Sequence, residues 1–335
     1  MALRVAINGF GRIGRLVMRA IAEKEGADLE VIAINDLGPP ESNAYLLQYD
    51  SVHGTFGQDV SVQAGHLQIG KRQIKVLAEP NPEKLPWKDL AIDIVLECSG
   101  RFTSKDAAYK HIQAGAKRVL ISAPADGVDL TVVFGVNHDK ISAEHTILSN
   151  ASCTTNCLAP VASVLHKTIG IDRGYMTTIH AYTGDQSLVD TLHKDLRRAR
   201  AAALSMIPTS TGAAKAVGLV MPELKGKLDG TAIRVPTPNV SMIDFTFDAS
   251  RETTAEEINE AVISAAKGSL AGILATVKAP LVSIDFNHNP HSSIFDLTQT
   301  QVIEKKFCRI LAWYDNEWGF SNRMLDTALQ IGKFL

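Results

Sequence analysis

A cysteine at the predicted start of a helix is the first group in this chain that could act as a nucleophile. Residues 149–157 have the sequence SNASCTTNC, and an apolar helical pattern follows over 157–168. The positive end of a helix dipole stabilises a thiolate, so this position predicts a lowered pKa for Cys153. Packing roles are expected for Cys157, one turn further along, and for Cys98 and Cys308, which lie in strand-like runs.

An activated thiol needs a base or an imidazolium beside it, and the chain has ten histidines. His180 is preferred because it ends the strand-like segment 174–179, where a strand delivers a side chain to a cleft. His288 and His291 could suggest a metal pair, but no third ligand accompanies them. Hydrogen bonding within a turn is the favoured role for those two, and no metal is expected.

A glycine-rich segment near the N-terminus has the spacing of a phosphate-binding turn. Residues 9–14 have the sequence GFGRIG and lie between a strand pattern and a helix pattern. Glycines there permit a tight turn and close approach of a pyrophosphate to the helix N-terminus. Asp36, 22 residues after Gly14, would accept both ribose hydroxyls and repel a 2′-phosphate, which favours NAD over NADP. The competing interpretation is a set of turn glycines with a helix-capping aspartate.

The elements that must position these groups change character near residue 150. Before it, apolar runs at 3–7, 29–34, 92–96, 119–121, 130–136 and 146–148 predict strands of a parallel sheet buried on both faces. A helix is expected over 13–25, and 67–77 predicts an inserted hairpin with Gly70 in its turn. After residue 150, long extended stretches at 231–247 and 307–314, a helix opened by Thr254, and a final helix over 321–334 predict an antiparallel α+β domain.

The predicted fold class is therefore α/β, with a doubly wound parallel sheet and an α+β catalytic domain whose sheet is mainly antiparallel. The first domain is expected to span 1–151, with a C-terminal helix (about 316–335) packing back on it, and the catalytic domain 152–315.

Composition excludes several classes of protein. Lys and Arg number 34 and Asp and Glu 36 in 335 residues, so the net charge of −2 gives no general attraction to nucleic acid or anionic membranes. Four cysteines are too few for a disulfide scaffold, and no 18-residue apolar stretch or signal peptide is evident. A soluble cytoplasmic protein is expected, with nucleic-acid binding at most a secondary property.

Motifs along nearly the whole chain resemble those of phosphorylating glyceraldehyde-3-phosphate dehydrogenases of the bacterial and organellar type. They lie at 8–15, 149–157, 180–183, 195–200, 208–215, 234–239 and 314–319. The resemblance implies a Rossmann-type first domain, a homotetramer, and NAD as cofactor. It also implies the NAD-dependent conversion of D-glyceraldehyde 3-phosphate and inorganic phosphate to 1,3-bisphosphoglycerate in glycolysis and gluconeogenesis, through a cysteine thiohemiacetal and a thioester.

The same resemblance implies a role for each matching residue. Cys153 would be the nucleophile and His180 the base. Cofactor contacts would come from Gly9, Gly11, Arg12, Ile13, Gly14, Asp36, Ser99, Gly100, Ser122 and Asn316, the last of which would bind the nicotinamide carboxamide. The substrate phosphate would be held by Thr183, Asp185, Arg198 and Arg234, and the incoming phosphate by Ser152, Thr154, Thr211, Gly212 and again Arg234.

Three alternatives compete with this interpretation. Erythrose-4-phosphate dehydrogenases share the cysteine and histidine but let water resolve the thioester. A binding module for RNA or partner proteins would use the dinucleotide cleft or the basic loop at 194–200. A cysteine hydrolase would explain Cys153 and His180 but would leave the first domain without a role.

Overall fold

The computed structural model describes residues 2–24, 26 and 28–335, and their contacts divide the chain into two compact units. Unit 1 comprises the described residues up to Val132, together with His138–Ala151 and Ser321–Leu335. Unit 2 comprises Val133–Asn137 and Ser152–Phe320. Two short segments, 133–137 and 316–320, thus group with unit 2, whereas the sequence placed them with the first domain. Among the described residues, no helix is long and apolar enough to cross a membrane.

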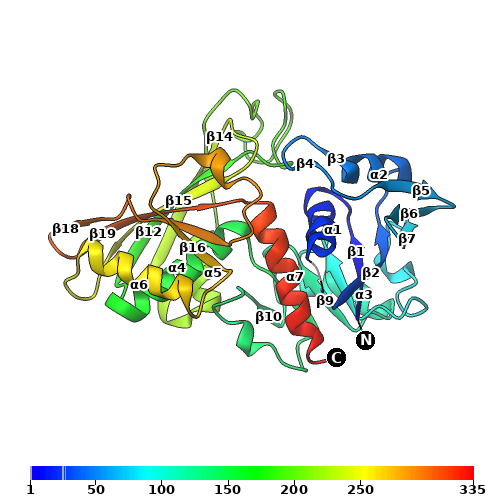
Figure 1. Ribbon diagram of the computed structural model, residues 1–335, viewed down its shortest axis with the longest axis horizontal. Helices are drawn as coiled ribbons and strands as arrows, with labels where there is room; N and C mark the ends of the chain where they lie inside the picture. Colours follow the sequence, from blue (N-terminus) through cyan, green and yellow to red (C-terminus); the bar gives the residue numbers. More distant parts are fainter. Residues whose placement is uncertain (1, 25, 27) are drawn as a thin grey trace. The chain divides into compact units, whose positions relative to one another are not determined.

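Unit 1 is built on a nine-stranded sheet in the order β10-β11-β9-β8-β1-β2-β7-β6-β5 (Figure 1). Its strands are β1 (Leu3–Asn8), β2 (Leu29–Asn35), β5 (Val60–Gln63), β6 (His66–Ile69), β7 (Arg72–Leu77), β8 (Ile94–Glu97), β9 (Arg118–Ile121), β10 (Leu130–Thr131) and β11 (Ile147–Ser149). The run from β10 to β7 pairs in parallel, and β6 and β5 add antiparallel strands at one edge. A separate two-stranded ribbon joins β3 (Tyr49–Asp50) and β4 (Gly54–Thr55).

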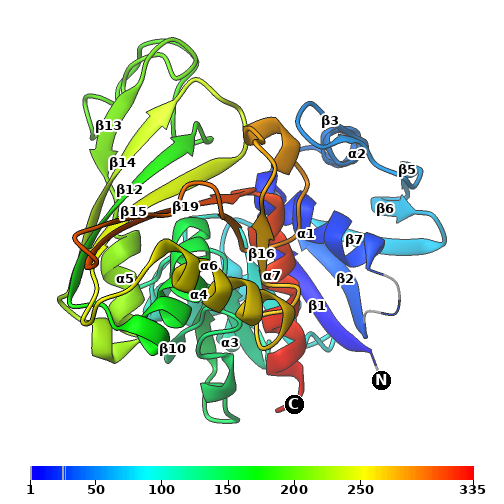
Figure 2. The ribbon, with the colours of Figure 1, turned by 60° about the vertical axis from the view of Figure 1, so that its left-hand side comes forward.

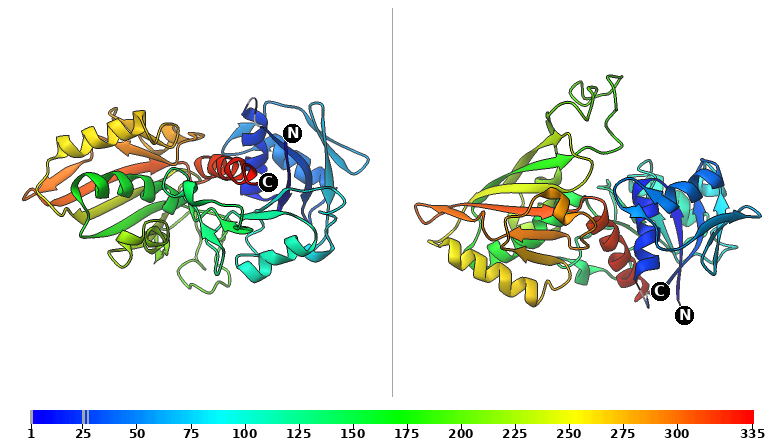
Figure 3. Two further views of the ribbon diagram at one scale, coloured as in Figure 1. Left: turned by 90° about the horizontal axis from the view of Figure 1, so that it is seen from below. Right: turned by 45° about the horizontal axis from the view of Figure 1, so that its top comes forward.

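Helices cover both faces of this sheet, which explains its continuous apolar strands. Val5, Ile7, Val95 and Leu120 are all completely buried. The helices of the unit are α1 (Arg12–Glu23), α2 (Pro40–Gln48), α3 (Lys105–Gln113) and the part of α7 (Trp318–Gly332) that begins at Ser321. The chain winds from β1 toward β2 and later from β8 toward β9, on the other side of β1. Right-handed connections then place α1 and α3 on opposite faces (Figure 3).

Unit 2 contains an eight-stranded sheet in the order β13-β14-β12-β15-β19-β17-β16, with β18 also pairing with β19. The strands are β12 (Arg173–Ala181), β13 (Ile207–Ser210), β14 (Leu228–Val235), β15 (Ser241–Asp248), β16 (Leu274–Val277), β17 (Ser293–Asp296), β18 (Gln301–Ile303) and β19 (Phe307–Tyr314). Only β12–β14 and β16–β17 among these pairs are parallel. The predicted α/β fold class is confirmed, with a mostly parallel sheet in one unit and a mixed, mostly antiparallel sheet in the other.

Three helices pack against the sheet of unit 2 (Figure 2): α4 (Cys153–Ile169), α5 (Ala213–Val220) and α6 (Ala255–Lys267). Helix α4 is buried along most of its length, because its apolar side chains contact β15, β17 and β19. The segment 182–206 between β12 and β13 extends away from this sheet as a long loop (Figure 3, right).

Several element predictions need correction. The extended stretch 231–247 is two strands, because Pro236 and Pro238 interrupt it, and β12 lies between them in the sheet. The apolar pattern over 157–168 is the later part of α4, which begins at Cys153, as expected for the nucleophile, because Ser152 caps it. The strand expected over 130–136 ends at Thr131. Helix α1 ends at Glu23, and residue 25, where the prediction ended, lies outside the described residues. The predicted hairpin forms as β6–β7, but it joins the main sheet through a parallel pair between β7 and β2.

Candidate active site

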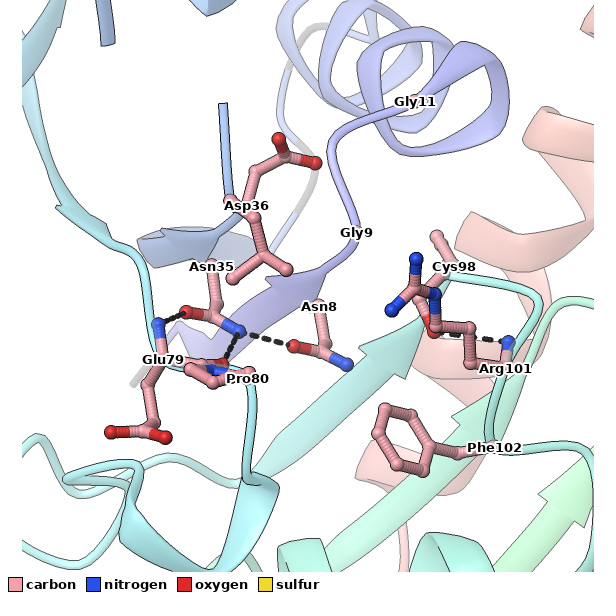
Figure 4. Close-up of a pocket in the computed structure, with 12 residues that line it drawn as sticks. Asn8, Gly9, Gly11, Asn35, Asp36, Glu79, Pro80, Cys98, Arg101 and Phe102 are labelled. Carbon is pink, nitrogen blue, oxygen red and sulfur yellow. Dashed lines mark hydrogen bonds between the residues drawn. The ribbon is translucent and has the colours of Figure 1, made fainter. Parts of the chain in front are cut away.

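Unit 1 has a cavity of about 300 Å³ at the carboxyl ends of its central parallel strands. The chain reverses its winding direction there, because β2 and β8 flank β1, and open α/β sheets bind ligands at such a switch point. Figure 4 shows Glu79 and Pro80 on one side of this cavity and Arg101 and Phe102 on the other. The cavity is lined by Asn8, Gly9, Gly11, Asn35, Asp36, Leu37, Glu79, Pro80, Cys98, Ser99, Arg101 and Phe102.

Two of the three motif glycines are required by the shape of the loop. Gly9 has a φ of +88°, and a Cβ added to it would lie 2.5 Å from the backbone of Ser99. A Cβ on Gly14 would lie 2.1 Å from the carbonyl oxygen of Gly9. Gly11 differs, because no protein atom lies within 4 Å of the position that its Cβ would take. Open space at the N-terminus of α1 fits the close approach of a pyrophosphate to backbone N–H groups.

Asp36 follows β2 and is tied to the glycine loop by its carboxylate. Its Oδ2 accepts a hydrogen bond from the N–H of Phe10 at 2.8 Å, and its Oδ1 accepts one from Gly38 at 2.9 Å. Each oxygen keeps a lone pair, and the side chain lines the cavity. The carboxylate is therefore placed to accept hydrogen bonds from the hydroxyls of a ribose.

Some expected cofactor residues do not line this cavity directly. The side chain of Arg12 forms an ion pair with Asp50, whose pKa falls to about 2 through two backbone N–H groups and this guanidinium, against the effect of burial. The guanidinium of Arg12 is thus engaged by Asp50, and its backbone forms the start of α1. Ile13, Gly14, Gly100 and Ser122 are likewise absent from the lining.

Sequence reasoning missed several residues that do line the cavity, including Asn8, Asn35, Arg101 and Phe102. Their position in the sequence could have indicated them, because each lies at or shortly after the carboxyl end of β1, β2 or β8. The side chain of Asn35 donates to Asn8 at 2.7 Å and to the Glu79 carbonyl at 2.9 Å (Figure 4).

In unit 2, Cys153 is the first residue of α4 and is partly exposed. The helix starts there because the Ser152 hydroxyl accepts a hydrogen bond from the N–H of Thr155 at 3.1 Å. The Cys153 Sγ lies 3.5 Å from Nε2 of His180. The nucleophile and the histidine that the sequence singled out are thus brought into contact.

His180 lies near the end of β12, and its position and tautomer follow from its neighbours. Its Nδ1 lies 2.7 Å from the carbonyl oxygen of Ala181, which can only accept, so this contact favours the tautomer with the proton on Nδ1. Nε2 is then the nitrogen with a lone pair that faces the Cys153 thiol. Arg234 is the partner of His180 in the β12–β14 register, and its Nη1 lies 3.1 Å from Nδ1 and donates to the Ala181 carbonyl at 3.0 Å.

Burial sets the ionisation of this pair, and Arg234 modifies it. Burial raises the pKa of Cys153, whereas the charge of Arg234 and hydrogen bonds from Thr154 lower it. Burial and then Arg234 lower the pKa of His180 to about 3. The sequence predicted a lowered pKa for the thiol from the helix N-terminus alone, and burial acts in the opposite direction. A neutral thiol and a neutral, buried imidazole are favoured over an ion pair next to a guanidinium.

The other residues expected at the first phosphate site form a network with Arg234 and Arg198. Arg234 Nη1 donates to the Thr183 hydroxyl at 3.2 Å. Arg198 forms an ion pair with Asp185 and donates from Nε to Thr209 at 2.9 Å. Asp185 is thus a partner of Arg198, and hydroxyl and guanidinium groups remain as the donors suited to a phosphate.

The residues expected at the second phosphate site gather around two helix N-termini. Gly212 is the N-cap of α5, and the Thr211 hydroxyl accepts a hydrogen bond from the N–H of Ala213 at 3.2 Å. The Thr155 hydroxyl donates to the Ala213 carbonyl at 3.2 Å, which joins the first turns of α4 and α5. The Thr154 hydroxyl lies 2.8 Å from that of Tyr314, and its backbone N–H belongs to the first turn of α4.

Asn316 is buried in unit 2, in the turn between β19 and α7. Its Oδ1 accepts a hydrogen bond from the Ser241 hydroxyl at 2.8 Å. His288 stacks on Trp318, and Nδ1 of His291 lies 2.8 Å from Oδ1 of Asn289. In the described part of the chain, no group of three or more His, Cys, Asp or Glu side chains is arranged to hold a metal ion.

Comparisons with known proteins account for both sites together. A family model described as the NAD binding domain of glyceraldehyde 3-phosphate dehydrogenase matches residues 3–105, and one described as the C-terminal domain matches residues 152–316. The chain is 66% identical over 333 residues to the glyceraldehyde-3-phosphate dehydrogenase of Xanthobacter flavus, covering 99% of each chain. It is 62% identical to the enzyme of that name from Cereibacter sphaeroides over 100% of each chain. It is 55% identical to the one from Geobacillus stearothermophilus, over 99% of this chain and 98% of the relative.

The chain belongs to the glyceraldehyde 3-phosphate dehydrogenase family. The resemblance inferred from the sequence is confirmed, and NAD is the cofactor of this NAD-dependent oxidoreductase. The cavity of unit 1 fits that cofactor, since it combines an open helix N-terminus at Gly11 with the carboxylate of Asp36.

Proposed function

We propose that this chain oxidises D-glyceraldehyde 3-phosphate and transfers the acyl group to inorganic phosphate, yielding 1,3-bisphosphoglycerate and NADH. The observation that carries the proposal is the contact of 3.5 Å between Cys153 Sγ and His180 Nε2 at the N-terminus of α4. A thiol that gives its proton to an imidazole becomes a nucleophile able to attack an aldehyde carbon.

In the first half-reaction, Cys153 Sγ bonds to the aldehyde carbon, and its proton passes through His180 to the aldehyde oxygen, forming a thiohemiacetal. The N–H of Cys153, at the start of α4, would stabilise the developing negative charge on that oxygen. Bound NAD would supply the acceptor for a hydride from the same carbon. His180 removes the hydroxyl proton as the hydride departs, and a thioester of Cys153 remains.

In the second half-reaction, an oxygen of inorganic phosphate attacks the thioester carbon. The carbon–sulfur bond breaks, the acyl phosphate leaves, and Cys153 regains its thiol by taking up a proton from His180. We assign the substrate phosphate to Thr183, Arg198 and Arg234, with Asp185 holding Arg198. We assign the attacking phosphate to Ser152, Thr154, Thr211, Gly212 and Arg234. The network around both guanidinium groups supports this division.

On the cofactor side, we assign the pyrophosphate to the backbone at Gly11, Arg12 and Ile13, with Gly9 and Gly14 shaping the loop. Asp36 would bind the adenosine ribose, and Ser99, Gly100 and Ser122 would lie along the cofactor. Asn316 would bind the carboxamide of the nicotinamide ring. The open position at Gly11 and the cavity-facing carboxylate of Asp36 support this assignment.

The nucleophile assignment is tested by Cys153→Ser, because a serine hydroxyl is a far weaker nucleophile beside a neutral imidazole. This variant should lose dehydrogenase activity and still bind NAD, as measured by NADH formation and by fluorescence quenching. Cys157→Ser is the matched control, since Cys157 is buried and bonded to Ser293. Substantial turnover by Cys153→Ser would refute the assignment.

We further propose that the enzyme is a cytoplasmic homotetramer. All four cysteines are free thiols, in keeping with a reducing compartment such as the cytoplasm, and cell fractionation would test this location. The loop 182–206 exposes a group of large apolar side chains: Leu188, Val189, Leu192, Leu196, Leu204 and Met206. Exposed apolar surface of this extent favours contact with a second chain. Light scattering coupled to gel filtration should give about four times the 36.2 kDa mass of one chain, and a monomer mass would contradict the proposal.

A further inference from the structure

Ser241, the first residue of β15, is a buried serine that contacts two elements of the active site. Its Oγ accepts a hydrogen bond from the N–H of Ala181, the residue after His180, at 3.0 Å. The same Oγ lies 2.8 Å from Oδ1 of Asn316. One hydroxyl thus connects the strand that carries the base with the side chain assigned to the nicotinamide ring.

The hydrogen-bonding capacity of a hydroxyl decides how the Asn316 amide is oriented. A serine hydroxyl has one proton to donate. Because the backbone N–H of Ala181 is itself a donor, the Ser241 proton is directed to Asn316 Oδ1. If the amide were rotated by half a turn, Nδ2 would face Oγ, and the Ser241 proton would have no acceptor there. The pairing therefore holds Oδ1 inward and leaves Nδ2 directed away from Ser241.

The backbone of Asn316 is held independently of its side chain. Asp315 is buried, and its carboxylate accepts four hydrogen bonds. The donors are the Asn239 side chain and the backbone N–H groups of His288, Glu317 and Trp318. With the turn held in this way, the remaining freedom is rotation of the amide, and that is what Ser241 controls.

We propose that Ser241 is a positioning residue that makes Asn316 present its Nδ2 donor to the carbonyl oxygen of the nicotinamide carboxamide. Among the residues that the structure describes, none accepts a hydrogen bond from Asn316 Nδ2, so this donor is available to a ligand. The inference rests on the proposed function, in which Asn316 binds the nicotinamide ring.

A double-mutant cycle in the full-length enzyme tests whether Ser241 acts through Asn316. Ser241→Ala should lower kcat/KM for NAD about tenfold, the effect expected for losing one fixed hydrogen bond. In the Asn316→Ala background the same substitution should change kcat/KM less than twofold, because no amide remains to be oriented. Ser241→Thr keeps the hydroxyl and should restore most of the activity. Ser293→Ala, at another buried serine of this sheet, is the control.

The cycle separates failure of this inference from failure of the proposed function. Equal losses from Ser241→Ala in both backgrounds would mean that Ser241 acts independently of Asn316, and would overturn the inference alone. An unchanged kcat/KM in Asn316→Ala would remove the proposed nicotinamide contact, and the inference with it.

The orientation of the amide is tested with the 3-acetylpyridine analogue of NAD, which keeps the ring carbonyl but lacks the NH₂ group. If wild-type Asn316 presents a donor, the analogue keeps that hydrogen bond. The Asn316→Asp side chain presents only acceptors. NAD can donate to them by rotating its carboxamide so that the NH₂ group faces the carboxylate, whereas the analogue has no donor to present. The ratio of kcat/KM for NAD to that for the analogue should therefore rise at least tenfold above wild type. An unchanged ratio would mean that wild-type Asn316 already presents its oxygen, and would overturn the proposal even if Ser241→Ala does not fold.

Discussion

Arg234 lowers the pKa of both groups of the catalytic pair, which favours the charged form of Cys153 and disfavours that of His180. Its positive charge stabilises the thiolate and opposes the imidazolium. Both effects follow from the register of β12 and β14, which places Arg234 beside His180. A bound phosphate that neutralises Arg234 would weaken both effects, so His180 would become more basic when substrate is present.

The effect on the thiol can be measured by alkylation. The thiolate is the reactive form, so the rate of reaction with iodoacetamide rises with pH until the thiol is fully ionised. Removing a neighbouring positive charge disfavours the thiolate, so Arg234→Leu should shift the midpoint of this profile to higher pH. The expected shift is on the order of 1 pH unit, or about 1.4 kcal/mol.

The matched control is Arg173→Leu, because Arg173 lies at the other end of β12 and pairs with Asp248. Its alkylation profile should coincide with that of the wild-type enzyme. A profile of Arg234→Leu that also coincides with wild type would show that this charge does not act on Cys153.

At this scale the sequence predicted the identity of the reactive groups better than their environment. Cys153 and His180 were singled out by position, at a helix start and near a strand end, and they are in contact. Their burial depends on packing between segments far apart in the chain, so no local pattern indicated its effect on the pKa of Cys153. The same reason explains why the sequence could not reveal Ser241, whose partners are Ala181 and Asn316.

In the turn between β1 and α1, the middle glycine of the motif leaves room for a ligand, whereas the first and last glycines are required by the fold. Gly9 and Gly14 contact the rest of the fold so closely that a side chain would displace the backbone. Gly11, between them, faces open space and is the N-cap of α1. The motif therefore contains two structural glycines and one whose absent side chain leaves room for the cofactor.

This division predicts different outcomes for two alanine substitutions. Gly14→Ala places a Cβ 2.1 Å from the Gly9 carbonyl oxygen, so it should lower the thermal midpoint and abolish NAD binding. Gly11→Ala meets no protein atom within 4 Å, so it should fold with a wild-type midpoint and weaken NAD binding at least tenfold. Thermal unfolding and NAD titration of the two variants would check this. Full NAD affinity in Gly11→Ala would place the pyrophosphate elsewhere.

Elements with strong local signals were predictable, and elements defined by long-range pairing were not. The parallel strands are buried on both faces, so they appear in the sequence as continuous apolar runs, and β1, β2 and β9 were predicted within one residue at each end. The division of 231–247 into β14 and β15 was missed, although Pro236 and Pro238 mark it. The short helix α5 was also missed, because its eight residues are too few for a clear amphipathic pattern.

At the scale of the whole molecule, the chemistry is divided between the two units. The cavity with Asp36 and the glycine loop belongs to unit 1, whereas Cys153, His180, Arg234 and Asn316 belong to unit 2. The change in element pattern near residue 150 indicated two such units. The grouping of 133–137 with unit 2 was not predictable, because it interrupts the first unit within the sequence.

Turnover tests the whole molecule, since it requires the cofactor site, the thiol and both phosphate sites at once. The most direct measurement is NADH formation from glyceraldehyde 3-phosphate and NAD, with and without inorganic phosphate or arsenate. We predict sustained turnover only when the oxyanion is present, because the Cys153 thioester is resolved by phosphate and not by water. Without it, NADH should stop after at most one equivalent per Cys153. A steady rate that does not depend on phosphate would rule out this mechanism and favour a dehydrogenase whose thioester is hydrolysed by water.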